Sequence, residues 1–386
     1  MFLKNTSPLK RSIILLFKRV VALLVLCMLA GEGLSQSLWK TVVRWIESTP
    51  EVDTCLIYSR PAHLSVELNS TMQNFTVGIG TDYSTRETAD SSLQRANSTM
   101  DFSGGLKNSI GIGVGYGNLC LGYGLDVSRR EQKKNKTFSL GFRGHKLGIG
   151  LNYYRLKNYA HSWTTVGEEG SAVYKHWERV SHNPCDVYRW SVDGYWSPNN
   201  RRFAYTAAYK SDMVQQHSAG GLLLGGSFLL SGMDCDASDQ MFYSSGIKNY
   251  VFYQASLVAG YSYNWVLYHR DGYDAGREGM RNLTLNATVL PLLSIYNRID
   301  LTPVVGGDAI KLGCPVSPDI NACAAISYTY GRLFVSLQCS YSMLYFRSPS
   351  DLTPARVLLE ERPIEEVSFH TTVQDWGVKV MGVWNF

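Results

Sequence analysis

The last eleven residues of the chain alternate between two kinds of side chain, and this feature constrains the fold most strongly. Successive residues of an extended strand point to opposite faces. In segment 376–386 one such face carries large apolar residues, namely Trp376, Val378, Val380, Trp384 and Phe386. A strand of this kind, with aromatic residues near its ends and a terminal Phe, is typical of the closing strand of a bacterial outer-membrane β-barrel. We therefore predict that these five residues form a lipid-facing membrane-insertion signal.

The same two-residue alternation recurs along most of the chain. Between Ser109 and Val127, large apolar residues alternate mainly with glycines on both sides of a Gly117-Asn118 turn. Further alternating runs occupy 138–142, 147–153, 188–196, 203–209, 251–265, 283–289 and 333–345. A tilted strand crosses a bilayer with about 9 to 11 residues. The sequence therefore predicts an all-β fold, an antiparallel transmembrane β-barrel of about 12 to 14 strands.

A soluble β-sandwich is the alternative fold, because it shows the same alternation. Its strands are usually shorter and carry less aromatic banding. The chain contains 24 Tyr, 14 Phe and 9 Trp, whereas charged residues make up only 18% of it. Together with the strand lengths and the terminal Phe, this composition favours the barrel.

The connections between the predicted strands differ in length. Tight turns at 117, 144 and 331 are separated by polar loops near 81–106, 159–186, 231–247, 298–317 and 348–371. Short periplasmic turns and long extracellular loops are expected of outer-membrane barrels. Two successive links, near 198–200 and 211–216, are both short, so the up-and-down parity breaks there and the strand number stays open.

The front of the chain has the features of an export signal. Four basic residues, Lys10, Arg11, Lys18 and Arg19, precede an apolar stretch at 20–30. We predict a signal peptide at 1–35, a short amphipathic periplasmic segment at 36–60 and the barrel at 61–386. An uncleaved anchor helix is the alternative for the first segment. Export and barrel together predict the outer membrane of a Gram-negative bacterium, with membrane lipid and the barrel-assembly machinery as partners.

The charge of the chain excludes one class of partner. The formal net charge is +5, but residues 1–35 hold five Lys/Arg and one acid, so their removal leaves 32 bases and 31 acids. Because no dense Lys/Arg stripe is present, the sequence predicts no nucleic-acid binding.

The residues that suggest chemistry give weak patterns. His217 and Ser218 resemble the pair used by barrel lipid hydrolases, but neighbouring strand residues point to opposite faces. The acidic loop at 234–239 lacks the glycine and closing glutamate of a dedicated Ca²⁺ site, and the histidines are scattered. We therefore predict no catalytic, cofactor-binding or metal-ligating residue. Cys314 and Cys323 flank a Pro-containing loop, where either a disulfide or two free thiols is possible.

Polar residues on the inward faces of the predicted strands are candidates for the barrel lumen. The principal candidates are Gln216, His217, Arg143, Arg189, Asp193, Lys210 and Asn264. Charges and amides inside a barrel either neutralise one another in a plugged core or line a selective passage. Plentiful inward Gly and Tyr favour a narrow or filled interior over a wide pore.

Three segments of the chain carry a resemblance to a known family. Residues 207–221, 259–267 and 284–291 resemble an uncharacterised family of Bacteroidota envelope proteins, a domain of unknown function, over about residues 50–386. His217 stands where that family is expected to have Lys. The resemblance implies an outer-membrane barrel and supplies no activity, so it adds no site residue.

The sequence thus predicts an outer-membrane β-barrel of unassigned, non-enzymatic activity. The expected role is passage of a small or apolar solute, or a structural role in the envelope. One alternative is an outer-membrane lipid hydrolase, and another is a surface binding or adhesion scaffold that uses the long extracellular loops.

Overall fold

The computed structural model describes most of the chain after residue 50. The described ranges are 51–85, 94–103, 106–127, 136–156, 160–167, 173–178, 186–234, 247–272, 279–303, 309–347 and 364–386. The chain divides into two units, Met1–Ser48 and Thr49–Phe386. The predicted signal peptide and most of the predicted periplasmic segment lie outside the described residues.

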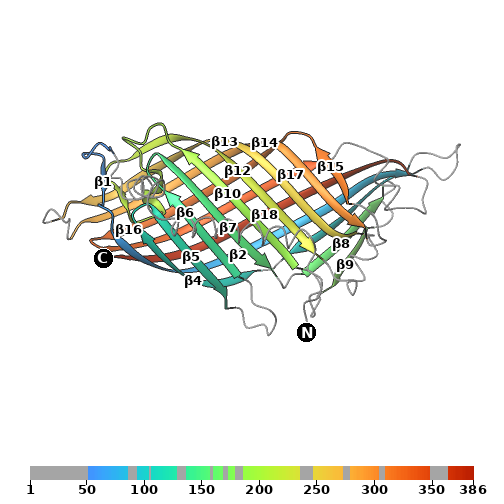
Figure 1. Cartoon of the computed structure of the whole chain (residues 1–386), viewed down its shortest axis with the longest axis horizontal. Helices are drawn as coiled ribbons and strands as arrows, with labels where there is room; N and C mark the ends of the chain where they lie inside the picture. The colour runs from blue at the N-terminus through green and yellow to red at the C-terminus, as the bar shows by residue number, and fades with distance from the viewer. Residues whose placement is uncertain are drawn as a thin grey trace, which may run out of the picture. The chain divides into compact units, whose positions relative to one another are not determined.

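In the described part of the chain, twelve antiparallel strands form a closed ring. Figure 1 shows these tilted strands from the side of the barrel. Each pairs with the next in chain order, and the last pairs with the first. The strands are β2 (Leu64–Thr85), β4 (Lys107–Tyr116), β5 (Leu119–Asp126), β6 (Lys136–Arg143), β7 (Leu147–Leu156), β10 (Asp186–Trp196), β12 (Ala219–Asp234), β13 (Ile247–Arg270), β14 (Arg281–Pro303), β16 (Ser317–Tyr330), β17 (Leu333–Arg347) and β18 (Ile364–Asn385). The predicted all-β antiparallel barrel is therefore confirmed, with the lower of the predicted strand numbers.

The seam between the first and last strands is long. The pairing of β18 with β2 runs from Ile364 opposite Thr85 to Asn385 opposite Ser65. This seam leaves the ring without an open sheet edge, so the backbone groups of the wall are paired within the protein.

One end of the barrel, here called the short-turn end, carries the tight connections. Gly117 and Gly331 have φ of 53°, which glycine adopts without strain, and each lies in a two-residue turn. The third short connection, at 144–146, and Phe386 lie at the same end. The predicted turns at 117, 144 and 331 are confirmed.

The opposite end, here called the loop end, contains strands where the sequence predicted loops. β3 (Gln94–Ser103) pairs with the last ten residues of β2, and β8 (Ala160–Gly167) and β9 (Val173–Glu178) extend this sheet. β15 (Ile310–Cys314) pairs with the end of β14. On one side, β2 continues past the end of its pairing with β4, and β14 continues past the end of its pairing with β16. The edges left free there pair with these additional strands.

The predicted strand at 203–209 is wrong. This segment contains η1 (Tyr205–Ala208), a 3-10 helix with Ala207 and Ala208 buried, and β10 pairs directly with β12. The connection between them, residues 197–218, folds inward and is here called the plug. With this segment removed from the strand list, the up-and-down parity is regular. The segment is apolar because most of it is buried inside the barrel, including Phe203, Ala204 and Ala208.

The plug pairs with the segment that precedes the first barrel strand. β11 (Met213–Gln215) lies antiparallel to β1 (Ile57–Ser59). An apolar cluster of Ile57, Ala204, Ala207 and Met213 packs between them. Residues 51–63, here called the lead-in segment, and the plug therefore form one packed element.

Of the two states left open for Cys314 and Cys323, the disulfide is excluded, because Cys323 is a free thiol. β15 and β16 follow β14 in one direction, with Cys314 opposite Asn297 and Cys323 opposite Thr288. Nine residues of extended chain span about 30 Å, far beyond the reach of a disulfide.

The outer face of the wall is apolar, as the alternation predicts. Ile110, Ile112 and Val114 are each about half exposed, whereas Gly111 and Gly113 on the other face are buried. In β18 the structure exposes Trp376, Val380, Trp384 and Phe386 and leaves Val378 partly exposed. Within the described ranges, no helix is long and apolar enough to cross a membrane.

The loop half of the barrel interior is filled by hydrophobic side chains. This apolar cluster consists of Phe75, Val77, Ile79, Val187, Leu229, Met233, Tyr250, Phe252, Ile299, Leu301, Leu312, Leu344, Phe346 and Val373. The rings of Phe252 and Phe346 stack with centroids 4.1 Å apart, and Tyr250 Oη lies 2.7 Å from Thr371 Oγ1. Side chains from non-adjacent strands therefore meet here as they do between the layers of a β-sandwich.

We expect Phe252→Ala to lower the free energy of unfolding by about 3–5 kcal/mol, because it leaves a cavity in a close-packed cluster. Leu257→Ala, on the outer face of the same strand, is the control and should cost less than half as much, since it creates no cavity. Urea unfolding in detergent micelles measures both. Equal losses would show that the apolar cluster does not stabilise the barrel.

Candidate functional site

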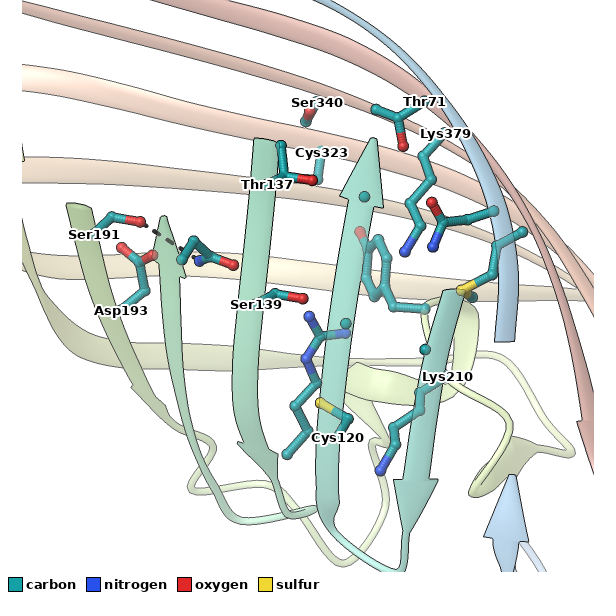
Figure 2. Close-up of a pocket in the computed structure, with 18 of the residues that line it drawn as sticks. Thr71, Cys120, Thr137, Ser139, Ser191, Asp193, Lys210, Cys323, Ser340 and Lys379 are labelled. Atoms are coloured by element: carbon teal, nitrogen blue, oxygen red, sulfur yellow. Dashed lines mark hydrogen bonds between the residues drawn. The ribbon is translucent and has the colours of Figure 1, made fainter. Parts of the chain in front are cut away.

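A polar cavity of about 640 Å³ lies inside the barrel next to the plug. Plug residues Tyr205, Tyr209, Lys210 and Ser211 line one side. Elsewhere it is lined by Tyr154, which packs against the apolar cluster, and by Arg189, whose guanidinium lies 5.5 Å from the Phe75 ring centroid. Figure 2 shows side chains from several strands entering this space. The volume falls within the range of roughly 300 to 1,000 Å³ that is usual for small-molecule sites.

The glycines of β4 and β5 make room for polar side chains of neighbouring strands. A Cβ at Gly122 would lie 2.5 Å from Ser139 Oγ, and one at Gly124 would lie 2.4 Å from Thr137 Oγ1. Likewise, a Cβ at Gly111 would lie 2.5 Å from Asn69 Oδ1. The lumen-facing glycines therefore allow hydroxyl and amide groups to lie flat over the wall, which keeps the cavity polar.

Most of the charges around the cavity are paired. Lys379 Nζ lies 2.6 Å from Glu67 Oε1, and Arg189 NH1 lies 2.8 Å from Asp375 Oδ2. Lys210 forms an ion pair with Asp212 within the plug. Lys210 and Lys379 enter the cavity from different elements (Figure 2). Because buried charges are costly unless compensated, these pairs stabilise a polar interior.

Arg143 differs from the other cavity cations. It is the last residue of β6, and its side chain is exposed to the cavity. It lies within electrostatic range of Glu67, Tyr195 and Tyr205, but in the described part of the chain no carboxylate lies within ion-pair distance of it. The one nearby carboxylate, that of Glu67, is already neutralised by Lys379.

The barrel wall holds the plug through hydrogen bonds to the plug backbone. Asn264 Nδ2 donates to the Ala204 carbonyl at 2.9 Å, and Asn282 Nδ2 donates to the Gln215 carbonyl at 2.8 Å. Ser336 Oγ donates to the Ala208 carbonyl at 3.2 Å. The three wall residues are almost fully buried, so each bond satisfies groups that would otherwise lack a partner.

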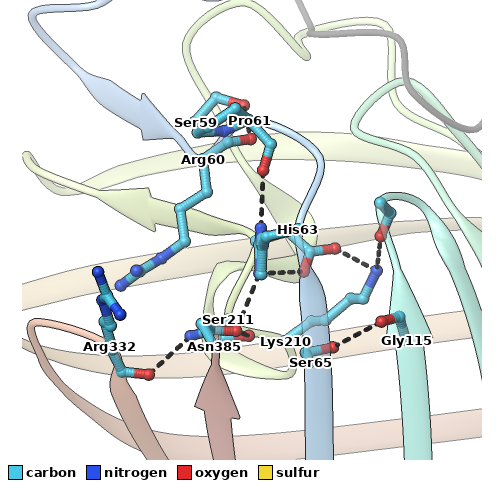
Figure 3. Close-up of polar contacts among 12 residues, drawn as sticks. Ser59, Arg60, Pro61, His63, Ser65, Gly115, Lys210, Ser211, Arg332 and Asn385 are labelled. Carbon is cyan, nitrogen blue, oxygen red and sulfur yellow. Dashed lines mark hydrogen bonds and ion pairs between the residues drawn. The ribbon is translucent and has the colours of Figure 1, made fainter. Parts of the chain in front are cut away.

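A second set of contacts joins the plug to the rim of the barrel. Lys210 Nζ donates to the Gly117 carbonyl at 2.9 Å, and Ser211 Oγ donates to Asn385 Oδ1 at 2.8 Å. His63 Nε2 lies 2.9 Å from the same Asn385 oxygen. Figure 3 shows how these groups meet between the lead-in segment, the plug and the last strand. The plug therefore contacts opposite parts of the wall and crosses the lumen at the short-turn end.

The predicted lumen residues fall into three groups. Arg143, Arg189 and Asp193 line the cavity from the wall, and Lys210 lines it from the plug. Asn264 faces inward but binds the plug, and Gln216 is buried with its amide nitrogen 3.0 Å from the Thr54 carbonyl oxygen.

His217 is exposed and is not among the residues that line the cavity. Both His217 and Ser218 are exposed, and Ser218 Oγ accepts a hydrogen bond from the backbone N–H of Val266 at 2.9 Å. Among the described residues, no hydrogen bond joins His217 to Ser218. The two residues precede β12, and therefore do not follow its alternation.

Several cavity residues were missing from the predicted set. Ser65, Glu67, Asn69, Thr71 and Gln73 form one polar face of β2, and all five line the cavity. Their strict alternation was the available signal. Tyr205 and Tyr209 enter the cavity from the plug, for which the sequence carries no comparable pattern. Among the residues that the structure describes, no group of three His, Cys, Asp or Glu is placed to hold a metal ion.

Comparison with known families gives one decisive match. The model of DUF4421, a domain of unknown function, matches residues 68–353, about three quarters of the chain. The chain belongs to the DUF4421 family. No curated protein sequence matches it.

Several solved structures of outer-membrane proteins align weakly with the chain. A bacterial polysaccharide outer membrane secretin aligns at 10% identity and a TM-score of 0.28, covering 84% of this chain and 98% of its own. The P. putida toluene transporter TodX aligns at 7% identity and a TM-score of 0.23, covering 88% of this chain and 99% of its own. The outer membrane protease OmpT from Escherichia coli aligns at 6% identity and a TM-score of 0.27, covering 83% of this chain and 97% of its own.

We expect Asn264→Ala and Asn282→Ala to loosen the plug of this DUF4421 protein. Each leaves a plug carbonyl without its donor, which costs about 1–3 kcal/mol. Hydrogen exchange of plug amides in 204–215 should accelerate about ten-fold or more. Asn297→Ala is the matched control, because Asn297 donates to the Pro315 carbonyl, away from the plug. Unchanged plug exchange in both test variants would contradict the proposed anchoring.

Proposed function

We propose that this protein is a non-enzymatic barrel of the Gram-negative outer membrane through which a small solute passes by way of the polar cavity. The observation that carries this proposal is the cavity itself, a polar space of about 640 Å³ inside a closed barrel, bordered by a plug segment. We propose a Bacteroidota source, a signal peptide at 1–35, a periplasmic segment at 36–60 and a barrel from 61 onward.

The outer face of the wall supports the membrane location. Apolar side chains that would have no partner in water, such as Leu222, Leu257 and Val289, are about half exposed. Aromatic residues lie toward both ends of the wall, with Trp196, Tyr330 and Trp384 at the short-turn end, and Tyr345 and Trp376 further toward the loop end. An apolar band between aromatic belts is the pattern that lipid contact selects. Outer-membrane lipid and, during insertion, the barrel-assembly machinery are the partners we propose.

The interior supports a gated passage more than an open pore. The apolar cluster fills the loop half, and the plug crosses the lumen at the short-turn end. Between them lie hydroxyls, amides and compensated charges, which solvate a polar solute. Passage therefore requires the plug to move and the apolar cluster to open at the loop half. The hydrogen bonds from Asn264, Asn282 and Ser336 hold the plug in the closed position.

The other two roles have less support. The lipid hydrolase needs a nucleophile beside a base, and His217 and Ser218 are not hydrogen-bonded to each other. The adhesion scaffold would depend on the loop end, where the described strands β3, β8 and β9 show an extended sheet but no binding site.

The membrane location predicts a depth-dependent cost for a charge on the outer face. Val380 lies four residues from both Trp376 and Trp384 and is 50% exposed. In phospholipid vesicles we expect Val380→Arg to lower the unfolding free energy by about 2–4 kcal/mol. Gln374→Arg, on the same face but beyond Trp376, should cost about 0–1 kcal/mol. Equal effects at the two positions would contradict burial of this face in lipid.

The passage function predicts conductance that the plug controls. In planar lipid bilayers, wild-type barrels should open rarely, because the plug and the apolar cluster both block the lumen. We expect the Asn264→Ala/Asn282→Ala double variant to open much more often, whereas Asn297→Ala should behave like wild type. Heat-modifiable gel migration shows that each protein is folded. Electrical silence of both the wild type and the double variant, when folded, would overturn the passage function.

A further inference from the structure

We infer that the cavity contains a binding site for a small oxyanion, a carboxylate or a phosphate group, built on Arg143 and Tyr205. The inference rests on the proposed function, which it deepens by naming the class of solute. Two properties of the cavity carry it, an uncompensated cation and a hydrogen-bond donor without an acceptor.

Arg143 supplies the uncompensated cation. The other three cavity cations, Lys210, Lys379 and Arg189, each have a carboxylate within ion-pair distance. Arg143 has none among the described residues, although it lies inside the barrel, where an unpaired charge is costly. A guanidinium in this situation gains most from a ligand that brings its own negative charge, and its planar fork suits carboxylate and phosphate oxygens.

The arrangement of the wall leaves the guanidinium available. A Cβ built at Gly141 would lie 3.6 Å from Arg143 Nε and 3.0 Å from Cys120 Sγ. The Arg143 side chain therefore lies over Gly141, beside Cys120, on its own side of the barrel. A larger residue than glycine at position 141 would displace it.

Tyr205 supplies the free donor. Three tyrosines border this part of the cavity, and two of their hydroxyls are occupied. Tyr195 Oη donates to the Gly144 carbonyl at 2.8 Å, and Tyr209 Oη donates to Asn286 Oδ1. The hydroxyl of Tyr205 has no hydrogen-bond partner in the described part of the chain, while its ring packs edge-on against Tyr195 with centroids 4.9 Å apart. Because Tyr195 Oη binds the carbonyl of Gly144, the residue after Arg143, the packing of Tyr205 on Tyr195 holds Tyr205 near Arg143 with its donor unused.

The surrounding charges favour one anion of modest size. The Glu67 carboxylate, which would repel an anion, is held by Lys379 Nζ and by Asn69 Nδ2 at 2.8 Å. Asp193 is the remaining cavity acid and accepts a hydrogen bond from Ser227 Oγ at 2.7 Å. It lies opposite Gly150 on β7, whereas Arg143 lies opposite Gly148, so the two uncompensated charges are separated by an intervening strand.

The proposed anion site also lies on the proposed path of the solute, between the barrel wall and the plug. Arg143 ends β6 at the short-turn end, and Tyr205 belongs to the plug. An anion bound by both Arg143 and Tyr205 would contact the barrel wall and the plug at the same time. Movement of the plug would withdraw the Tyr205 hydroxyl, one of the two donors to the anion. The anion would therefore bind more weakly as the plug opens the lumen.

Calorimetric titration of the folded protein in detergent micelles tests the site, with inorganic phosphate and sodium acetate as separate probes. We expect saturable binding of at least one, and the one that binds identifies the source of the oxyanion. Arg143→Gln should weaken this binding about ten-fold or more, Arg143→Lys should restore part of it, and Tyr205→Phe should weaken it about three-fold or more. Arg201→Gln is the matched control, because Arg201 pairs with Glu51 on the surface, outside the cavity.

The inference is overturned if neither anion binds the wild type, or if Arg143→Gln binds as tightly as Arg201→Gln. Bilayer recordings separate this failure from failure of the proposed function. Under a KCl gradient, replacing Arg143 by Gln in the Asn264→Ala/Asn282→Ala background should shift the reversal potential toward cation preference. A barrel that conducts without such a shift contradicts the anion site alone, whereas a barrel that binds the anion but never conducts contradicts the passage alone.

Discussion

The requirement that every backbone group of the wall find a partner within the protein determines the rest of this structure. In lipid, an unpaired N–H or C=O costs several kcal/mol, so a spanning sheet must close. Closure occurs where β18 pairs with β2 along almost the whole length of both strands. Once the ring is closed, successive side chains of each strand point either to the outside of the barrel or into its lumen. Apolar side chains such as Val380 lie outside, and polar ones such as Lys379 lie inside.

The interior shows how one wall supports three different environments along its length. At the loop half, long strands such as β13 and β17 continue, and their rings pack as in a soluble core. In the middle, the short strands β4 to β7 present glycine and hydroxyl groups, which cannot fill the lumen, and a polar cavity remains. At the short-turn end, buried asparagines bind a folded segment through its carbonyls. Hydrophobic contact and hydrogen bonding therefore each close one part of the barrel.

The sequence predicted the wall far better than what lies inside it. Alternation in 109–127, 283–289 and 376–386 depends only on which face meets the lumen, so strands and turns could be recognised. The same rule misassigned 203–209, because the segment is apolar for another reason: it is a 3-10 helix inside the barrel, with the consecutive residues Thr206, Ala207 and Ala208 all buried. Arg143 and Asp193 were recognised as inward-facing, but their lack of an ion partner could not be predicted. Pairings such as Glu67 with Lys379 join residues about 300 positions apart, and only the closed seam brings them together.

The pairing of β1 with β11 has a consequence for the order of assembly. Six of the twelve wall strands separate the two short strands along the chain, yet β1 and β11 pack as one element inside the ring. A finished cylinder offers no side entrance for a chain segment of this size. The lead-in segment and the plug are therefore either seated before β18 pairs with β2 or inserted through the short-turn end, where the plug contacts the rim. Because the pairing of β18 with β2 joins the most distant parts of the chain, it is also the slowest contact to form by diffusion.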